Sequence, residues 1–219
     1  MATPQPASTQ RDARIDALLS RAPVLPVLRI DRIEDAVPLA RTLVDAGLSV
    51  LEVTLRSDIA LEAIRRIVDS VPGACVGAGT VLDATQLAAV ARAGAAFAIS
   101  PGATDALYDA ATTAALPWIP AVATASDVMR GIDRGYRRFK FFPAEAAGGV
   151  VALRAFAGPF ADVLFCPTGG IDADNAPGYL RLSNVITVGG SWMAPADAIA
   201  AGDWTRIGAM ARACLALSR

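Results

Sequence analysis

Short apolar runs alternate with helical patterns along almost the whole chain, and this alternation restricts the possible folds more than any other feature. Eight apolar runs recur at a spacing of roughly 20 to 25 residues, separated by stretches with helical periodicity. Such alternation is typical of parallel strands joined by crossover helices. The predicted strands are residues 23–30, 49–56, 75–81, 97–102, 117–122, 138–144, 162–170 and 185–192.

Helices are predicted between these strands and before the first of them. Several end at a glycine that can take the left-handed conformation common just after a helix, as at Gly47, Gly94 and Gly135. Eight strand–helix units predict an α/β fold, a (β/α)8 TIM barrel with an extra N-terminal helix that covers its bottom. An open doubly wound sheet is the alternative, but no GxGxxG sequence follows the first strand and no Walker A sequence occurs. The predicted helices include residues 11–20, 31–46, 83–93, 104–115, 124–134 and 172–182.

The length of 219 residues suits one such barrel. We expect a single domain over residues 11–219, preceded by a disordered tail over residues 1–10, which are rich in Pro, Ser, Thr and Ala. The tail lacks the apolar stretch of a secretory signal. No run of eighteen apolar residues occurs, so no membrane span is predicted. The three cysteines are widely spaced and are interpreted as reduced, which indicates a cytoplasmic location.

Charge and histidine content narrow the possible chemistry. The formal net charge is −1, so we expect no general attraction to nucleic acid or to an anionic membrane, and the expected partner is a small molecule. The chain contains no histidine, which excludes Ser-His-Asp and Cys-His catalysis and HExxH zinc sites. Reactive groups must therefore come from Lys, Glu, Asp, Arg, Tyr or the backbone.

The second predicted strand carries polar residues on one face only. Alternation along the strand places Glu52, Thr54 and Arg56 on one face and leucine or valine on the other. Because the apolar face suits the helix layer, the polar face is expected to point into the barrel. Arg56 would then lie nearest the C-terminal mouth, where barrel enzymes carry their active sites. A structural ion pair between Glu52 and Arg56 is the alternative interpretation.

The sixth predicted strand contains Lys140 among Phe139, Phe141 and Phe142. Burial disfavours the ammonium form of a lysine, and a desolvated lysine is the usual carbonyl nucleophile of Schiff-base enzymes. Phe142 lies on the same face as Lys140 and would keep an imine dry. Strands two and six are four apart in a ring of eight, so Glu52 and Lys140 are expected to face each other across the barrel. Alternatively, the lysine extends its head to the mouth or pairs permanently with a carboxylate.

The last two predicted strands both end in a glycine pair, Gly169-Gly170 and Gly189-Gly190, followed by helical sequence. In phosphate-binding barrels, the loops after strands seven and eight offer backbone N–H groups to the phosphate. A single glycine pair would indicate only a turn. Two pairs at these two strand ends favour a phosphate site.

Six segments, in order along the chain, resemble the successive signatures of the bacterial 2-keto-3-deoxy-6-phosphogluconate (KDPG) and 4-hydroxy-2-oxoglutarate (KHG) aldolase family. The resemblance covers nearly the whole chain after the N-terminal tail, and no catalytic position departs from it. Ala147, where the family often has Asn, is a departure outside those positions. The segments are VLEVTLR (50–56), VGAGTV (76–81), ISPG (99–102), FKFFPAE (139–145), FCPTGGI (165–171) and GGSW (189–192).

This resemblance implies a class I, Schiff-base aldolase of the Entner–Doudoroff pathway, a homotrimer that uses no metal or other cofactor. The implied reaction is cleavage of 2-dehydro-3-deoxy-6-phospho-D-gluconate to pyruvate and D-glyceraldehyde 3-phosphate, with 4-hydroxy-2-oxoglutarate as a further substrate that yields pyruvate and glyoxylate. By the same resemblance, Lys140 is the Schiff-base lysine and Glu52 transfers protons. The implied substrate-binding residues are Arg56 and Thr80 at the pyruvyl carboxylate, Thr168 at a position typical of the gluconate branch, and Gly169, Gly170, Gly190 and Ser191 at the phosphate.

Two functions of other kinds remain open from the residues alone. A barrel enzyme that binds sugar phosphates without covalent chemistry, such as an isomerase or a decarboxylase, would keep its activity after borohydride treatment with pyruvate. A catalytically silent phosphosugar-binding protein would bind ligand but release no pyruvate in an assay coupled to lactate dehydrogenase.

Lys140 is the only lysine in the chain, which makes the Schiff-base hypothesis directly testable. We expect borohydride reduction in the presence of pyruvate to attach one pyruvyl group per chain, at Lys140, as measured by mass spectrometry and peptide mapping. Lys140→Arg should abolish trapping and turnover while the fold remains. An unmodified chain after reduction would rule out the Schiff-base mechanism.

Overall fold

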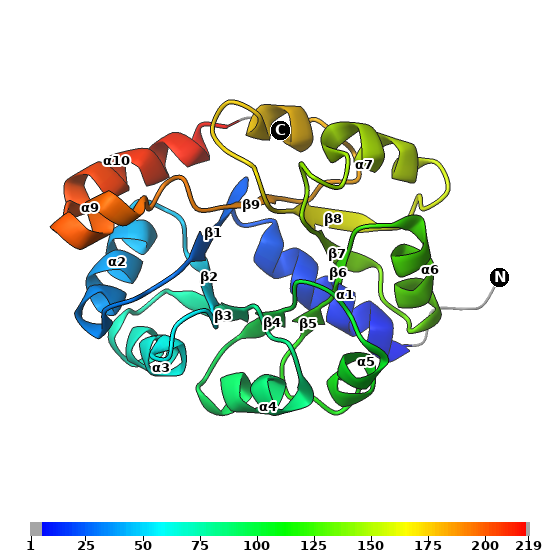
Figure 1. Ribbon diagram of the computed structural model, residues 1–219, viewed down its shortest axis with the longest axis horizontal. Helices are drawn as coiled ribbons and strands as arrows, with labels where there is room; N and C mark the ends of the chain where they lie inside the picture. Colours follow the sequence, from blue (N-terminus) through cyan, green and yellow to red (C-terminus); the bar gives the residue numbers. More distant parts are fainter. Residues whose placement is uncertain (1–5, 218–219) are drawn as a thin grey trace.

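The computed structural model describes residues 6–217 and shows strands at the centre with helices around them (Figure 1). Every predicted strand forms within its predicted range, and the fifth is divided into two parts. The strands are β1 (Val24–Leu28), β2 (Val50–Thr54), β3 (Cys75–Gly79), β4 (Phe97–Ile99), β5 (Trp118–Ile119), β6 (Ala121–Val122), β7 (Arg138–Phe141), β8 (Leu164–Pro167) and β9 (Val188–Gly190). The helices are α1 (Pro6–Leu19), α2 (Ile33–Asp45), α3 (Ala60–Ser70), α4 (Ala84–Arg92), α5 (Asp105–Ala111), α6 (Ala125–Asp133), α7 (Gly149–Ala157), α8 (Ala176–Leu180), α9 (Ala196–Ala201) and α10 (Trp204–Leu215).

The strands form a parallel barrel in chain order. One set is paired in the order β5-β4-β3-β2-β1-β9 and another in the order β6-β7-β8. The two sets meet at Pro120, which divides the fifth strand because proline has no N–H to donate to a neighbour. The Pro120 carbonyl still accepts a hydrogen bond of 3.0 Å from the backbone of β7. At the other junction, the bridge between Thr168 and Gly189 joins β8 to β9. The predicted (β/α)8 barrel is therefore confirmed.

The outer faces of the strands pack against the helices, as the alternation on β2 predicted. Leu51 and Val53 are fully buried in the main apolar core between the strands and the helix layer. From α3, Ile64 and Ile67 enter the same core at the spacing of one helical face. The glycines that follow α2, α4 and α6 take positive φ values between 81° and 101°, which confirms their predicted role at the helix ends.

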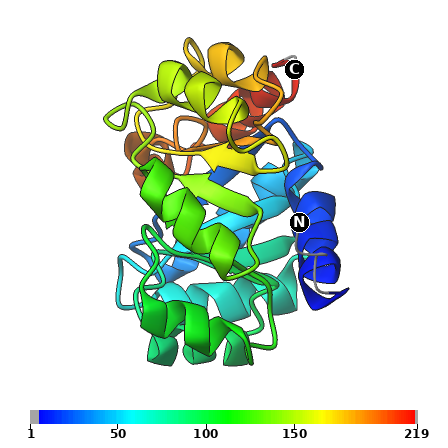
Figure 2. The same ribbon diagram turned by 90° about the vertical axis from the view of Figure 1, so that its right-hand side faces the viewer.

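Helix α1 covers the N-terminal end of the barrel, as predicted. It crosses behind the strands in Figure 1 and lies to one side of them in Figure 2. Ile15 and Leu19 are buried against Leu25 and Phe97 in a second apolar core at this end of the barrel. The helix therefore supplies apolar side chains that close the barrel floor.

The start of α1 corrects the expected N-terminal tail of residues 1–10. The helix begins at Pro6, so residues 6–10 are helical rather than part of a disordered tail, whereas residues 1–5 lie outside the described residues. Proline suits the first turn of a helix because its missing N–H would have no intrahelical partner there. The Pro-, Ser- and Thr-rich composition of the segment therefore did not prevent helix formation.

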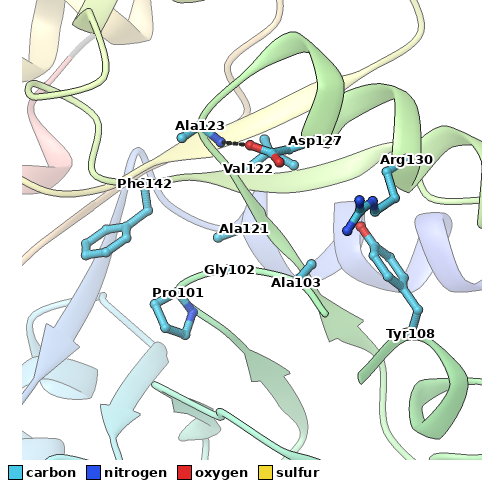
Figure 3. A pocket seen from close by; sticks show the side chains of 10 residues that line it. All are labelled: Pro101, Gly102, Ala103, Tyr108, Ala121, Val122, Ala123, Asp127, Arg130 and Phe142. Carbon is cyan, nitrogen blue, oxygen red and sulfur yellow. Dashed lines mark hydrogen bonds between the residues drawn. The ribbon is translucent and has the colours of Figure 1, made fainter. Parts of the chain in front are cut away.

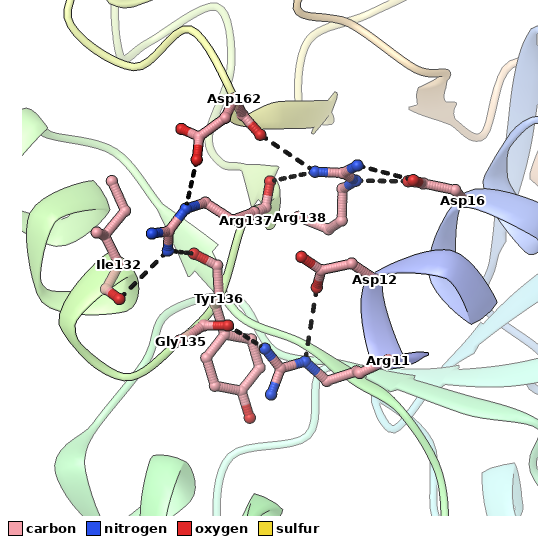
Figure 4. Close-up of polar contacts among 9 residues, drawn as sticks. All are labelled: Arg11, Asp12, Asp16, Ile132, Gly135, Tyr136, Arg137, Arg138 and Asp162. Atoms are coloured by element: carbon pink, nitrogen blue, oxygen red, sulfur yellow. Dashed lines mark hydrogen bonds and ion pairs between the residues drawn. The ribbon is translucent and has the colours of Figure 1, made fainter. Parts of the chain in front are cut away.

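Polar contacts fasten α1 to the N-terminal end of β7 (Figure 4). The Arg138 guanidinium binds the Asp16 carboxylate through two hydrogen bonds, one of them 2.7 Å between Nη2 and Oδ2. The Arg11 guanidinium lies 3.7 Å from the centre of the Tyr136 ring. Burial raises the pKa of Asp12, which is close to Arg11. The helix is thus held by charge as well as by apolar packing.

No helix within residues 6–217 is long and apolar enough to cross a membrane. The three cysteines are free, with Cys166 and Cys214 buried and Cys75 half-buried. Burial raises the pKa of the Cys214 thiol to about 11, so this thiol stays protonated at neutral pH.

Replacement of Asp16 tests the contribution of the α1 contact. We expect Asp16→Asn to lower the free energy of unfolding by about 1–2 kcal/mol, measured by urea denaturation, because it weakens a partly buried, charge-assisted contact. Asp197→Asn is the matched control, since its pair with Arg206 is exposed, and it should leave the free energy of unfolding within experimental error. Equal effects of the two substitutions would show that Asp16 is not an anchor of α1.

Candidate active site

A buried ion pair joins β7 to β2 across the barrel interior. Lys140 Nζ donates a 2.9 Å hydrogen bond to Glu52 Oε1. Lys140 is 5% exposed and Glu52 is fully buried. The prediction that these two side chains face each other is confirmed. The alternative Glu52–Arg56 pair does not form, and Arg56 has no ion-pair partner within residues 6–217.

The surroundings of this pair argue against a purely structural role. Removal of two charges from water costs several kcal/mol per ion, and this cost is offset only where the remaining polar atoms are also hydrogen-bonded. Glu52 Oε2 is buried and has no hydrogen-bond partner in the described part of the chain. A pair kept for stability alone would be expected to satisfy both carboxylate oxygens. The alternative of a permanent structural pair is therefore disfavoured.

Besides the Glu52 carboxylate, an aromatic ring and a thiol lie near the Lys140 amine. Its Nζ lies 5.5 Å from the centre of the Phe142 ring, as expected for two residues on the same face of β7. On the neighbouring strand β8, Cys166 pairs in register with Lys140. Burial raises the pKa of the Cys166 thiol to about 12, so this group stays protonated and is a poor nucleophile. Lys140 is therefore the stronger candidate nucleophile of the two.

Arg56 and Thr80 lie close together at the ends of β2 and β3. The Leu55 N–H donates to the Gly79 carbonyl at 2.9 Å, which holds the two strand ends side by side. Arg56 is exposed, and its Nε donates to Thr54 Oγ1 at 3.1 Å. Thr80 has a φ of +59°, a conformation unusual for a β-branched residue and one that recurs at ligand-binding positions. These two side chains are available to a carboxylate at one side of the mouth.

The ends of β8 and β9 present backbone donors at the other side of the mouth. Gly169 and Gly170 have φ values of +105° and +77°, which only glycine adopts readily. Within residues 6–217, the N–H groups of Gly170 and Ser191 donate to no other group, whereas the bridge between Thr168 and Gly189 engages the Gly169 N–H. Thr168 is buried and bridges to Gly189. Two free N–H groups at adjacent strand ends form a suitable anion-binding site.

Gly190 has a different surrounding from the other glycines of this site. A Cβ atom at this position would lie 1.8 Å from the Trp192 ring. The missing side chain therefore makes room for an indole that packs against the backbone of β9. The predicted contact of Gly190 with a phosphate remains a prediction, and a larger residue there would first displace Trp192.

A contact that the sequence analysis did not identify secures the glycine loop. The Tyr179 hydroxyl donates to the Glu145 carboxylate, and the Glu145 N–H donates to the Gly169 carbonyl at 3.1 Å. The loop after β8 is thereby attached to the end of β7, which carries the lysine. Glu145 lies in the segment FKFFPAE (139–145), which is one of the six that carry the family resemblance. No pattern in the sequence pairs it with Tyr179.

A cavity of about 110 Å³ adjoins the site at the ends of β4 and β6 (Figure 3). Phe142 forms part of its wall, so the cavity borders the lysine environment. Asp127 and Arg130, both on α6, bring opposite charges to it. The cavity therefore has no single charge that would select a ligand, and no sequence motif predicted it.

The complete arrangement suits an elongated substrate with an acidic group at each end. An amine and a carboxylate lie at the centre, a guanidinium and a threonine at one side, and free N–H groups at the other. Such a site can hold a carboxylate and a phosphate while an amine attacks a carbonyl between them. Within residues 6–217, no three His, Cys, Asp or Glu side chains come together in a way that could hold a metal ion.

Comparison with known proteins agrees with this geometry. The family model for KDPG and KHG aldolase matches residues 15–210. The chain is 55% identical over 201 residues to the 2-dehydro-3-deoxy-phosphogluconate aldolase of Dickeya dadantii, an alignment that covers 92% of this chain and 94% of that protein. It is also 55% identical over 197 residues to the KHG/KDPG aldolase of Escherichia coli K12, with coverage of 90% and 92%.

A solved structure supports the same relationship. The chain is similar to the KDPG aldolase of Legionella pneumophila, whose crystal structure holds pyruvate captured at low pH as a covalent carbinolamine intermediate. The TM-score is 0.89 at 46% sequence identity, and the match covers 93% of this chain and 98% of the other. Sequence and fold comparisons therefore cover a similar share of this chain.

Proposed function

The chain belongs to the KDPG and KHG aldolase family, and we propose that it cleaves 2-dehydro-3-deoxy-6-phospho-D-gluconate to pyruvate and D-glyceraldehyde 3-phosphate through a Schiff base on Lys140. The observation that carries this proposal is the buried 2.9 Å contact between Lys140 Nζ and Glu52 Oε1. It puts a nucleophile and a proton acceptor together inside the barrel. The covalent carbinolamine of the Legionella relative supports the same chemistry.

Imine formation starts from this contact. Glu52 accepts a proton from the Lys140 ammonium group, which frees the nitrogen lone pair to attack the C2 ketone of the substrate. The resulting carbinolamine loses its hydroxyl as water after that proton is returned, and an iminium ion remains. The iminium nitrogen can then accept electrons without a metal ion. Phe142 limits the access of water to it.

Carbon–carbon cleavage uses the same carboxylate. Acting through a water molecule, Glu52 removes the proton of the C4 hydroxyl while the C3–C4 bond breaks and its electrons move into the iminium group. D-glyceraldehyde 3-phosphate leaves, and an enamine stays on Lys140. Glu52 then returns a proton to C3, and hydrolysis of the new iminium ion releases pyruvate. One carboxylate thus serves alternately as base and acid.

The two ends of the substrate bind to different strand ends in this proposal. Arg56 offers a planar pair of N–H donors to the C1 carboxylate, a geometry that lysine cannot reproduce, and Thr80 lies beside it. The N–H groups of Gly170 and Ser191 receive the phosphate, together with Gly169, Gly190 and Thr168 nearby. Lys140 lies between these two regions and faces C2.

Further properties follow from the family relationship and remain proposals. Cleavage of 4-hydroxy-2-oxoglutarate to pyruvate and glyoxylate would use the same lysine, since this substrate has the same ketone, carboxylate and C4 hydroxyl. A homotrimer and a cytoplasmic location are proposed on the family resemblance and the reduced cysteines.

Replacement of Glu52 tests the proton-transfer role. Glu52→Gln keeps the shape of the side chain but cannot exchange a proton. We expect kcat for pyruvate release to fall on the order of 10²-fold or more, with slower imine formation and a smaller change in KM. A coupled assay with lactate dehydrogenase measures the first quantity, and borohydride quenching measures the second. Near wild-type turnover would assign the base to another group or to water.

A charge placed at the phosphate end tests the division between binding and chemistry. Ser191→Asp should repel the phosphate and shrink the ratio of kcat/KM for phosphorylated substrate over 4-hydroxy-2-oxoglutarate by roughly 10²-fold, equivalent to about 3 kcal/mol. Ser191→Asn, of similar size but uncharged, is the control and should change this ratio far less. Pyruvate trapping at Lys140 should continue in both variants. Equal losses for both substrates, with failed trapping, would contradict the phosphate assignment.

A further inference from the structure

The inner face of β3 is almost without side chains. In this strand Val76 and Ala78 belong to the outer core, so Cys75, Gly77 and Gly79 face the barrel interior. Neither Gly77 nor Gly79 has a positive φ value, so the backbone conformation does not require glycine at either position. In a strand interior, alanine is normally preferred to glycine. The reason for these glycines must therefore lie in what surrounds them.

The space beside Gly79 is occupied by the Glu52 side chain. A Cβ atom at position 79 would lie 2.1 Å from Glu52 Oε1 and 2.8 Å from its Cδ and Cγ atoms. These separations are far below the 3.5–4.0 Å or so at which non-bonded atoms are at rest. Oε1 is also the oxygen that accepts the hydrogen bond from Lys140. Even one methyl group at position 79 would therefore move the oxygen that contacts the lysine.

The other glycine on this face, Gly77, has different neighbours. A Cβ atom at Gly77 would lie 2.2 Å from the Phe97 ring, which belongs to the apolar core at the barrel floor. Gly77 thus makes room for apolar packing, whereas Gly79 makes room for the carboxylate. The two positions provide a matched pair, because the same substitution on the same strand face meets either a core ring or the active-site acid.

We propose that Gly79 is a positioning residue for proton transfer, because its missing side chain lets Glu52 lie along β3 and reach Lys140. The inference rests on the proposed function, in which Glu52 moves protons during the reaction. Gly79 itself touches no reacting atom of the substrate in this proposal. Because position 79 has no side chain, the Glu52 carboxylate can occupy a position from which it reaches both the lysine and the bound substrate.

The test compares imine formation with proton transfer in Gly79→Ala. Pyruvate should still be trapped at Lys140 by borohydride because the nucleophile is present, but more slowly than in the wild type, since the displaced carboxylate also assists imine formation. Exchange of the methyl protons of pyruvate with deuterated water, followed by NMR, should slow by about 10²-fold, close to the loss in Glu52→Gln. In the cleavage reaction kcat should fall by a factor similar to that for exchange, and KM should change less than about threefold.

Two further variants separate positioning from general damage. Gly79→Ala should lower the melting temperature of the wild-type protein but not that of Glu52→Ala, where the methyl group enters the space vacated by the carboxylate. Gly77→Ala should also lower the melting temperature, because the new methyl group meets Phe97. It should not slow the exchange of pyruvate methyl protons by a larger factor than it slows borohydride trapping. If Gly79→Ala does not fold, folding of the Gly79→Ala/Glu52→Ala double variant would itself support the proposed clash.

The possible results distinguish this inference from the proposed function. Exchange within about threefold of wild type in Gly79→Ala, combined with slow exchange in Glu52→Gln, would overturn the inference alone. Normal exchange in Glu52→Gln would overturn the role of Glu52 in the proposed function. Equal loss of stability from Gly79→Ala in the wild-type and Glu52→Ala backgrounds would show that Gly79 serves the barrel generally, which also overturns the inference.

Discussion

The contact between the Lys140 ammonium group and the Glu52 carboxylate is the interaction on which the site depends. Both groups are removed from water, and one carboxylate oxygen has no hydrogen-bond partner in the described part of the chain. Such a pair is expensive to bury and contributes little stability compared with apolar packing. It is nevertheless well suited to chemistry, because a proton can pass between the two groups over 2.9 Å. The apolar layers on both faces of the barrel wall provide the stability that this pair does not.

The barrel divides its tasks among strand ends. β2 and β3 present Arg56 and Thr80, β8 and β9 present free N–H groups, and the lysine on β7 lies between them. The opposite end of the barrel is closed by α1 through apolar packing and the Arg138–Asp16 contact. The contacts that support stability and the groups proposed to bind substrate therefore lie at opposite ends of the same strands, as is usual for this fold. The loops at the mouth can hold strained or glycine-rich conformations because the floor does not depend on them.

Much of this could be predicted from the sequence because it follows from periodicity. The strand ranges, the inward face of β2 and the opposition of Glu52 and Lys140 depend only on alternation along a strand and on counting strands in a ring. Other features depend on distances between segments remote in sequence. Nothing in the neighbouring sequence indicates three such features. They are the Tyr179–Glu145 contact, the packing of Trp192 on Gly190 and the position of the Glu52 side chain beside Gly79. The start of α1 at Pro6 was missed because composition is a weak guide at a helix terminus.

The sequence by itself determined the number and order of the strands, the identity of the only lysine and the absence of histidine, and hence the kind of chemistry that the chain can perform. These properties belong to single residues or to periodic patterns, so they need no knowledge of neighbours. The tertiary structure decided which oxygen of Glu52 meets the lysine, which backbone donors remain free, and which glycines are needed for space rather than for backbone conformation. Those outcomes depend on the close packing of side chains from different strands, where a shift of one methyl group changes what can fit.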